Sequence, residues 1–458
     1  MKAKKKNFKP KLLALFCGII VLLLIWLLLV KFEGETPSIS LDPASSYIGK
    51  THEISVSVSD IKSGVKKLWI GLIKEGKERV VFEKEFPRAG LLGAGKQHQA
   101  TFNIQIDPRK LGLSDGKAML RMVASDFSWR KWWHGNRTYI EKEVTIDTKP
   151  PEINMLSRVH NVSQGGSGLV TYRLSEPCQN DGVYVGSHYF PGHAGYFKDR
   201  SIAMAFFAVG YNQGAETDIF LQATDFSGNV SRSHIPHYFK KKGFKKDVVN
   251  IPDSFLKRKM VEFGDADTKY SEMPLIEKFL KVNRELRRIN HGQIDKLVEQ
   301  TDVDIYWEGA FSRLPNSARK SGFADDRKYK YKGKVVDQQV HLGIDLASIA
   351  HSPIPAANRG KIVFTGDLGI YGKTVMIDHG FGLFSTYSHL SSLTATQGQM
   401  VAKGDIIGHT GSTGLAGGDH LHFGILINRT FVNPIEWWDG TWIKNNIVNK
   451  INDIKSSN

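Results

Sequence analysis

Two histidines near the C-terminus, His420 and His422, are separated by one residue in the stretch GDHLHFG. Side chains alternate between the faces of a strand, so these imidazoles would share one face, about 7 Å apart at about 3.3 Å per residue. Imidazole is the commonest metal ligand and changes its charge near neutral pH. The pair could therefore bind a metal, transfer protons or simply form a polar strand face, and the spacing leaves open which of the two would bind a metal.

A second candidate pair, His341 and Asp345, lies four residues apart in VHLGIDLAS. On one straight strand these side chains would be about 13 Å apart, which is too far to share an ion. Gly343 lies between them and lets the chain bend. A further histidine, His389, ends a long alternating stretch, residues 360–390, that is typical of a hairpin.

These candidates follow one another in a fixed order along the chain: His341-x-x-x-Asp345, then Tyr-x-His389-Leu, then the turn GQMVAKGDIIG, then His420-x-His422-Phe. The ordered set resembles the lysostaphin/LytM-type zinc metallopeptidases over roughly residues 310–436. Enzymes of that family hydrolyse peptide bonds in bacterial peptidoglycan. The resemblance implies an antiparallel-β peptidase domain, which we place at residues 309–438.

The same resemblance implies a role for each candidate. His341, Asp345 and His422 would be the ligands of one zinc ion per chain. His420 would be the general base or acid, and His389 would assist at the transition state. Two imidazoles and one carboxylate leave zinc a net positive charge and an open coordination position for water.

Other residues near this set have expected roles in shaping or supporting the site. The segment SGFADDRKYKY resembles the family's opening Phe-Gly-x-Arg segment, but Ala324 and a longer insertion stand there, so one groove wall is expected to differ. Asn316 in RLPNSAR is expected to be a turn residue, the alternative being a fourth ligand that blocks the metal, as in some relatives' pro-forms. His379 and His409 lie at expected turns, where we predict surface or supporting roles.

The N-terminus predicts a membrane anchor. Residues 12–30 form nineteen consecutive positions without a charge, enough to span a hydrocarbon core of about 30 Å. Residues 1–11 are rich in lysine, which predicts a cytoplasmic tail. The apolar run ends in LLLVKFEGE without the small residues of a signal-peptide cleavage site. We therefore expect a single-pass protein of the cytoplasmic (inner) membrane, with its C-terminal part in the periplasm or extracytoplasmic space.

Composition limits the kinds of partner. The chain has 458 residues, a net charge of +16 and two cysteines, so no intramolecular disulfide is expected on the far side of the membrane. An anchored, exported protein does not meet nucleic acid, so we expect no nucleic-acid partner. The basic charge instead favours an acidic envelope polymer or the lipid surface.

The middle of the chain predicts a mainly β protein. Alternating stretches separated by Gly, Pro, Asp and Ser predict two β-sandwich, immunoglobulin-like domains at 36–147 and 148–238. VASDFSWR and QATDFSGN echo each other, which supports a repeat. We see no catalytic cluster in either sandwich and expect a spacer or docking role, with an envelope protein as a possible partner.

Two segments connect or follow these domains. Residues 239–308 are expected to be a short linker with a helix, because apolar residues recur at helical spacing within 273–290. We expect this helix to pack on the C-terminal domain rather than bind a partner. Residues 439–458 are predicted to be a polar tail.

These features together predict a membrane-anchored zinc metalloendopeptidase that hydrolyses peptide cross-links or stem peptides of peptidoglycan in cell-wall remodelling. The alternative is a non-catalytic LytM-like binding module that activates another cell-wall hydrolase. Relatives of that second kind lack metal ligands, whereas all three ligand positions are filled here.

Overall fold

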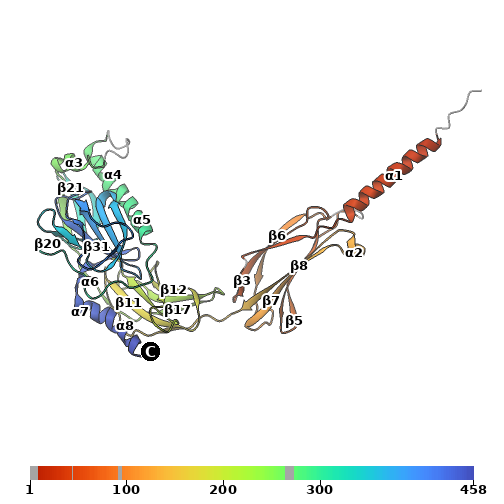
Figure 1. Cartoon of the computed structure of the whole chain (residues 1–458), viewed down its shortest axis with the longest axis horizontal. Coiled ribbons are helices and arrows are strands. Elements are labelled where there is room, and N and C mark those ends of the chain that lie inside the picture. The colour runs from red at the N-terminus through yellow and green to blue at the C-terminus, as the bar shows by residue number, and fades with distance from the viewer. Residues whose placement is uncertain (1–8, 44, 91–94, 264–272, 458) are drawn as a thin grey trace, which may run out of the picture. The chain divides into compact units, whose positions relative to one another are not determined.

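The computed structural model describes residues 9–43, 45–90, 95–263 and 273–457 (Figure 1). The chain divides into two compact units: residues 1–150 with 225–229, and residues 151–224 with 230–458. Most of the predicted basic tail, 1–11, lies outside the described residues.

The first unit begins with a long apolar helix, α1 (Lys9–Lys31). Its window Leu12–Leu29 has a mean hydropathy of 3.2, and none of that window is buried. Within the described ranges it is the one helix long and apolar enough to cross a membrane, judged by length and composition. At 1.5 Å per residue its 23 residues extend about 34 Å, more than the thickness of a hydrocarbon core.

The rest of the first unit is a β-sandwich of two sheets. One has the strand order β1-β3-β6, and the other β2-β8-β7-β4-β5. Apolar residues alternate along β3 and β4, and residues such as Val56 and Leu68 bury into one shared core. The strands are β1 (Ser38–Asp42), β2 (Tyr47–Ile48), β3 (His52–Ser59), β4 (Val65–Lys74), β5 (Lys77–Glu85), β6 (Gln99–Ile106), β7 (Gly116–Asp126) and β8 (Arg137–Ile146), with the short helix α2 (Arg130–Trp133) before β8.

The second unit opens with two four-stranded sheets. Their strand orders are β14-β15-β11-β9 and β13-β12-β16-β17, and a separate ladder pairs β10 with β18. The mainly β prediction is therefore confirmed, while the immunoglobulin-like topology stays a prediction. The strands are β9 (Ile153–Met155), β10 (Asn161–Ser163), β11 (Ser167–Leu174), β12 (Cys178–Val185), β13 (His188–Pro191), β14 (His193–Ala194), β15 (Ile202–Ala208), β16 (Ile219–Asp225), β17 (Val230–His234) and β18 (Tyr238–Lys240).

An eight-stranded sheet forms the centre of the C-terminal region, in the order β20-β23-β31-β27-β26-β25-β29, with β32 beside β31. Strands β27 and β31 are buried along their whole lengths, so they lie in the middle of the core. Its strands are β20 (Ala318–Ser321), β23 (Ile344–Ala347), β25 (Gly360–Asp367), β26 (Lys373–Asp378), β27 (Leu383–Leu390), β29 (Met400–Val401), β31 (Leu421–Ile427) and β32 (Thr430–Val432).

Two smaller sheets complete the second unit. The sheet β19-β21-β22 consists of β19 (Lys246–Asn250), β21 (Asp325–Tyr331) and β22 (Lys334–His341), and the sheet β24-β30-β28 consists of β24 (Pro353–Pro355), β30 (Ile406–His409) and β28 (Ser392–Leu393). β19 comes from the predicted linker yet pairs with β21 of the predicted peptidase domain. A single hydrophobic core runs through this unit.

The predicted helix at 273–290 is present as a helical run on the flank of the sheet (Figure 1). It consists of α4 (Leu275–Lys281), the π-helical turn η2 (Val282–Leu286) and α5 (Arg287–Leu297), and it follows α3 (Asp253–Lys259). Buried Asn283 and its neighbour Arg284 both bond the carboxylate of Asp337. The helix therefore packs on the C-terminal domain, as expected.

The C-terminal segment differs from the predicted polar tail. After α6 (Pro434–Trp438), residues 440–457 form α7 (Gly440–Ile443), the π-helical turn η4 (Lys444–Val448) and α8 (Asn449–Ser457). Four isoleucines are buried along one stripe: Ile443, Ile447, Ile451 and Ile454. Their spacing of four, four and three residues is helical, but the charged and amide residues between them hid the pattern in the sequence.

Candidate metal centre and active site

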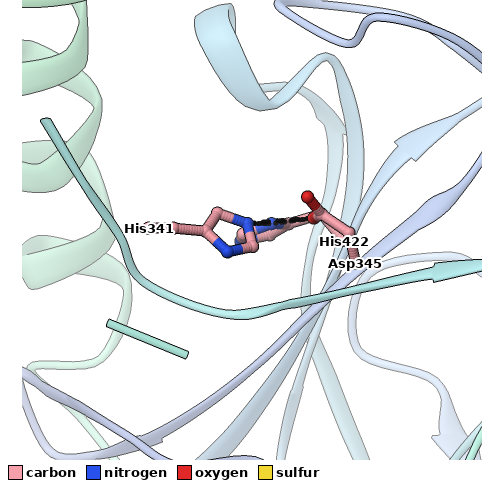
Figure 2. Close-up of side chains that lie close together, drawn as sticks. All are labelled: His341, Asp345 and His422. Carbon is pink, nitrogen blue, oxygen red and sulfur yellow. Dashed lines mark hydrogen bonds and ion pairs between the residues drawn. The ribbon is translucent and has the colours of Figure 1, made fainter. Parts of the chain in front are cut away.

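Three predicted ligands, His341, Asp345 and His422, meet at one point (Figure 2). Nε2 of His341 lies 2.9 Å from Oδ1 of Asp345 and 2.9 Å from Nδ1 of His422, and this Nδ1 lies 3.0 Å from the same oxygen. The arrangement follows from strand pairing, because β23 and β31 run antiparallel with Asp345 opposite His422. His341 ends β22, and the chain bends between His341 and Asp345 as predicted.

Hydrogen bonding shows why these three atoms suit a cation. Nδ1 of His341 lies 2.8 Å from the carbonyl of Gly322, an acceptor, so Nδ1 carries the proton and Nε2 presents a lone pair. That lone pair points at a carboxylate oxygen. Burial lowers the pKa of His422 to about 4, so its ring is neutral at neutral pH.

The lone pair on Nε2 of His341 and the Asp345 carboxylate repel each other unless a cation or a proton lies between them. Ligands at 2.0–2.1 Å from a tetrahedral zinc would be about 3.3 Å apart, slightly more than the separations found here. The donor set therefore fits a small divalent metal, and a slight expansion would admit zinc.

Gly343 has a different task from the one predicted. Its φ is not in the left-handed region that favours glycine. A Cβ placed on it would lie 2.5 Å from Nε2 of His422 and 2.8 Å from the carbonyl oxygen of Phe423. Glycine is therefore required to make room for the His422 ring, rather than to make the bend.

The sequence pointed to the segment SGFADDRKYKY, but not to the roles of Gly322 and Arg327 within it. Gly322 orients His341, and Arg327 donates from Nη2 to Oδ2 of Asp345 at 2.8 Å. Ala324 has a φ of 60°, the left-handed conformation that glycine adopts more easily. Ala324 stands where the family segment has glycine, and it keeps a glycine-like backbone conformation. The sequence feature that could have pointed to Arg327 was its position at the end of the Phe-x-x-x-Arg segment.

His420 lies beside the three donors without joining them. Its Nδ1 donates to the carbonyl of Gly418 at 2.8 Å, and its Nε2 lies 3.5 Å from Oδ1 of Asp345. Burial lowers the pKa of His420, but the hydrogen bond and charge of Asp345 outweigh that effect and raise it overall. Its Nε2 is therefore a basic atom facing the site.

His389, on β27, completes the group. Its ring centroid lies 5.0 Å from that of His420 and 5.8 Å from that of His422. Nδ1 donates to the carbonyl of Thr413 at 2.9 Å, which leaves Nε2 for the site. Its φ of 67° is strained for a residue other than glycine, and such strain concentrates at functional sites.

The donors line a cleft of about 430 Å³. The predicted linker supplies one wall, which the sequence did not indicate: Asn250, Phe255 and Arg258 line the cleft. Arg258 donates to the carbonyl of Gly417 at 3.3 Å, so this wall is tied to the opposite rim.

The other candidates from the sequence, His379, His409 and Asn316, have structural roles. His379 is fully buried rather than at the surface: Nδ1 donates to the carbonyl of Arg359 and Nε2 bonds the hydroxyl of Ser385. His409 bonds the hydroxyl of Ser392 through Nδ1. Asn316 has a φ of 52°, in keeping with a turn.

The part of the chain that holds this site is similar to known proteins. Residues 339–434 match the sequence profile of Peptidase family M23. A DD-carboxypeptidase/endopeptidase, Mpg, of Neisseria meningitidis is 43% identical over 97 residues, covering 21% of this chain and 22% of that protein. The peptidoglycan DD-endopeptidase ShyB of Vibrio cholerae is 32% identical over 133 residues, covering 28% of this chain and 30% of that protein. The chain thus spans less than a third of the length of these relatives.

One solved structure is similar to the C-terminal part of the chain. The catalytic domain of lysostaphin from Staphylococcus simulans is 28% identical with a TM-score of 0.25, covering 29% of this chain and 98% of that one. Residues 339–434, which match the family profile, contain all three converging donors, and this part of the chain is a Peptidase family M23 domain.

Proposed function

We propose that the chain is a membrane-anchored zinc metalloendopeptidase that hydrolyses peptide cross-links or stem peptides of bacterial peptidoglycan outside the cytoplasmic membrane. The observation that carries the proposal is the convergence of His341, Asp345 and His422 within 3.0 Å, with two further histidines beside them. Both similar proteins named above are described as endopeptidases, and one of them as acting on peptidoglycan.

In this proposal His341, Asp345 and His422 hold one zinc ion, which when bound would polarise the scissile carbonyl and activate water. Arg327 and the carbonyl of Gly322 fix the orientation of two of these ligands. Such supporting contacts set the geometry and basicity of metal ligands.

The two remaining histidines manage protons. His420 accepts a proton at Nε2 and delivers it to the leaving amine, because its Nδ1 is already committed to Gly418. Neutral His389 presents an unprotonated Nε2, since its Nδ1 proton goes to Thr413. It can therefore stabilise an oxyanion by donation only after accepting a proton itself.

The charge of the cleft fits a peptide with free carboxylates. Arg258 lines the cleft, and its partner Gly417 is a neutral carbonyl, so its charge is not neutralised by that contact. A substrate carboxylate would be a natural partner for this guanidinium.

The direct test of the activity is digestion of purified peptidoglycan by the full chain in detergent, followed by mass analysis of the fragments. Release of peptides cut at one kind of bond is expected, and it should require the metal. A preparation loaded with zinc that releases no fragment would contradict the proposal. The alternative, a binding module that activates another hydrolase, is less well supported because all three ligand positions are filled.

The membrane topology has its own test. A reporter that is active only in the cytoplasm, fused after Asn458, should be silent, because the basic residues before α1 keep that end inside. Strong reporter activity would contradict an extracytoplasmic peptidase.

A further inference from the structure

A second group of donors lies in the first unit, beside the end of α1. Glu33 follows α1, Asp60 follows β3, and Asp126 ends β7. Each offers a carboxylate oxygen within 4.8 Å of the other two. All three residues are buried, with exposed fractions of 7%, 4% and 0%. Burying three carboxylates together is unfavourable unless positive charge or protons compensate.

The hydrogen bonds of the group leave oxygens free for a ligand. Oδ1 of Asp60 accepts from the backbone N–H groups of Ser63 and Gly64. Asp126 accepts from the backbone and side chain of Asn136. By contrast, both oxygens of Glu33 are buried without any hydrogen-bond partner, although they lie against the other two carboxylates.

A nearby lysine compensates this group only without a direct bond. Lys62 attracts the charges of Glu33 and Asp60, but its salt bridge is with Glu35. Burial raises the pKa of Glu33, and the charges of Asp60 and Asp126 raise it further, against the opposing effect of the Ser63 hydroxyl. That hydroxyl lies 3.3 Å from Oδ1 of Asp60, to which it donates.

The same loop recurs later in the first unit. Asp225 accepts from the backbone of Asn229, whose side chain donates to the carbonyls of Asp147 and Lys149 and to Oδ2 of Asp225. Asn136 likewise donates to the carbonyls of Glu33 and Glu35 and to Oδ2 of Asp126. The position of Glu33 is thus filled by Asp147, another carboxylate, which is the physical basis of the sequence echo.

We infer that Glu33, Asp60 and Asp126 form a calcium site that ties the segment following α1 to both sheets of the first sandwich. Calcium prefers carboxylate and carbonyl oxygens at 2.3–2.6 Å, so two ligands of one ion can be up to about 5 Å apart. The separations here fall within that limit. Magnesium demands shorter, octahedral contacts and fits less well. The absence of imidazole or thiolate disfavours zinc at this site.

The site can be tested on the full chain in detergent by terbium luminescence and by calcium competition. Trp129 packs on Phe32, next to Glu33, and can sensitise a bound terbium ion. We expect saturable terbium binding that millimolar calcium displaces, and a calcium-dependent rise in the unfolding temperature of the wild-type chain. Glu33→Gln and Asp60→Asn should each weaken binding about tenfold or more, since site charge sets calcium affinity.

Two controls separate this site from other effects. Glu35→Gln removes an exposed glutamate of the same segment and should bind as the wild type does. His422→Ala removes a ligand of the peptidase centre and should also leave terbium binding unchanged. The inference is overturned if wild-type chain shows no saturable calcium binding at millimolar concentration, or if Glu33→Gln and Asp60→Asn both bind like the wild type. Stabilisation by acid alone, without calcium binding, would assign the cluster a shared proton instead.

Discussion

The metal centre of the M23 domain and the carboxylate cluster beside α1 are both buried sets of three donors, but their donors are held differently. At the metal centre a carbonyl orients His341, and an arginine orients Asp345. In the cluster, backbone N–H groups hold one oxygen of Asp60, and Glu33 has no partner. The two sites therefore differ in the ion that they favour. A mixed set of nitrogen and oxygen donors favours zinc, whereas oxygen donors alone favour calcium.

The largest expected effect on metal affinity comes from Gly343→Ala. The new Cβ would lie 2.5 Å from Nε2 of His422, so the ring must move out of the metal centre. Metal affinity should fall by about 100-fold or more, and peptidoglycan hydrolysis with it. Metal analysis after dialysis measures this. Gly243→Ala, where a Cβ meets no atom within 4 Å, is the matched control. Zinc retained at the wild-type level would show that the close approach is unimportant.

His389→Ala should separate catalysis from metal binding. The ring lies beside the donors but is not one of them, so zinc content should stay unchanged while the rate falls by about 10²–10³-fold. Hydrolysis by zinc-loaded protein measures the rate. His409→Ala, a histidine on β30 that bonds Ser392, is the control and should retain its rate. Unchanged turnover in His389→Ala would remove His389 from the mechanism.

Arg327→Gln tests the supporting contact that the cluster beside α1 lacks. Loss of the 2.8 Å bond to Asp345 should weaken zinc binding by about 10–100-fold. Competition with a coloured chelator measures the affinity. Lys328→Gln, on the next position of β21, should bind zinc normally. If both variants bind equally tightly, the arginine has no positioning role.

Arg258→Ala should have the smallest effect. If this guanidinium binds a substrate carboxylate at the exposed rim, its loss should raise KM about fivefold, or about 1 kcal/mol, with little change in kcat. Kinetics on a soluble peptidoglycan fragment measure both constants. Lys257→Ala, a neighbouring cation on α3, is the control. A fall in kcat at constant KM would point to chemistry rather than binding. None of these four variants should alter calcium binding beside α1.

The order and spacing of the histidines and Asp345 carried the resemblance to a known family, and that resemblance implied the ligand set His341, Asp345 and His422. Spacing alone left open whether His420 or His422 would bind the metal, and the structure brings His422 to the other two donors. The carboxylate cluster was not found, because its members lie 27 and 66 residues apart at the ends of different elements. The echo around Asp126 and Asp225 was interpreted as a repeat and not as a binding site.

Other parts of the fold depended on tertiary contacts that spacing does not encode. The linker strand β19 and the wall formed by α3 became visible only through their contacts with the M23 domain. Polar residues lie between the buried isoleucines of the C-terminal helices, so this segment was predicted to be a polar tail. Local patterns thus indicated the chemistry, while the long-range packing around it needed the structure.

The most direct test compares His420→Ala with His422→Ala for metal content and peptidoglycan cleavage. His422→Ala should lose most of its zinc, because Nδ1 of His422 is one of the three converging donors. His420→Ala should keep about one zinc per chain yet lose about 10²–10⁴-fold in rate, because its Nε2 moves protons without holding the metal. Loss of zinc in His420→Ala with retention in His422→Ala would contradict the assignment, as would near wild-type cleavage by either variant.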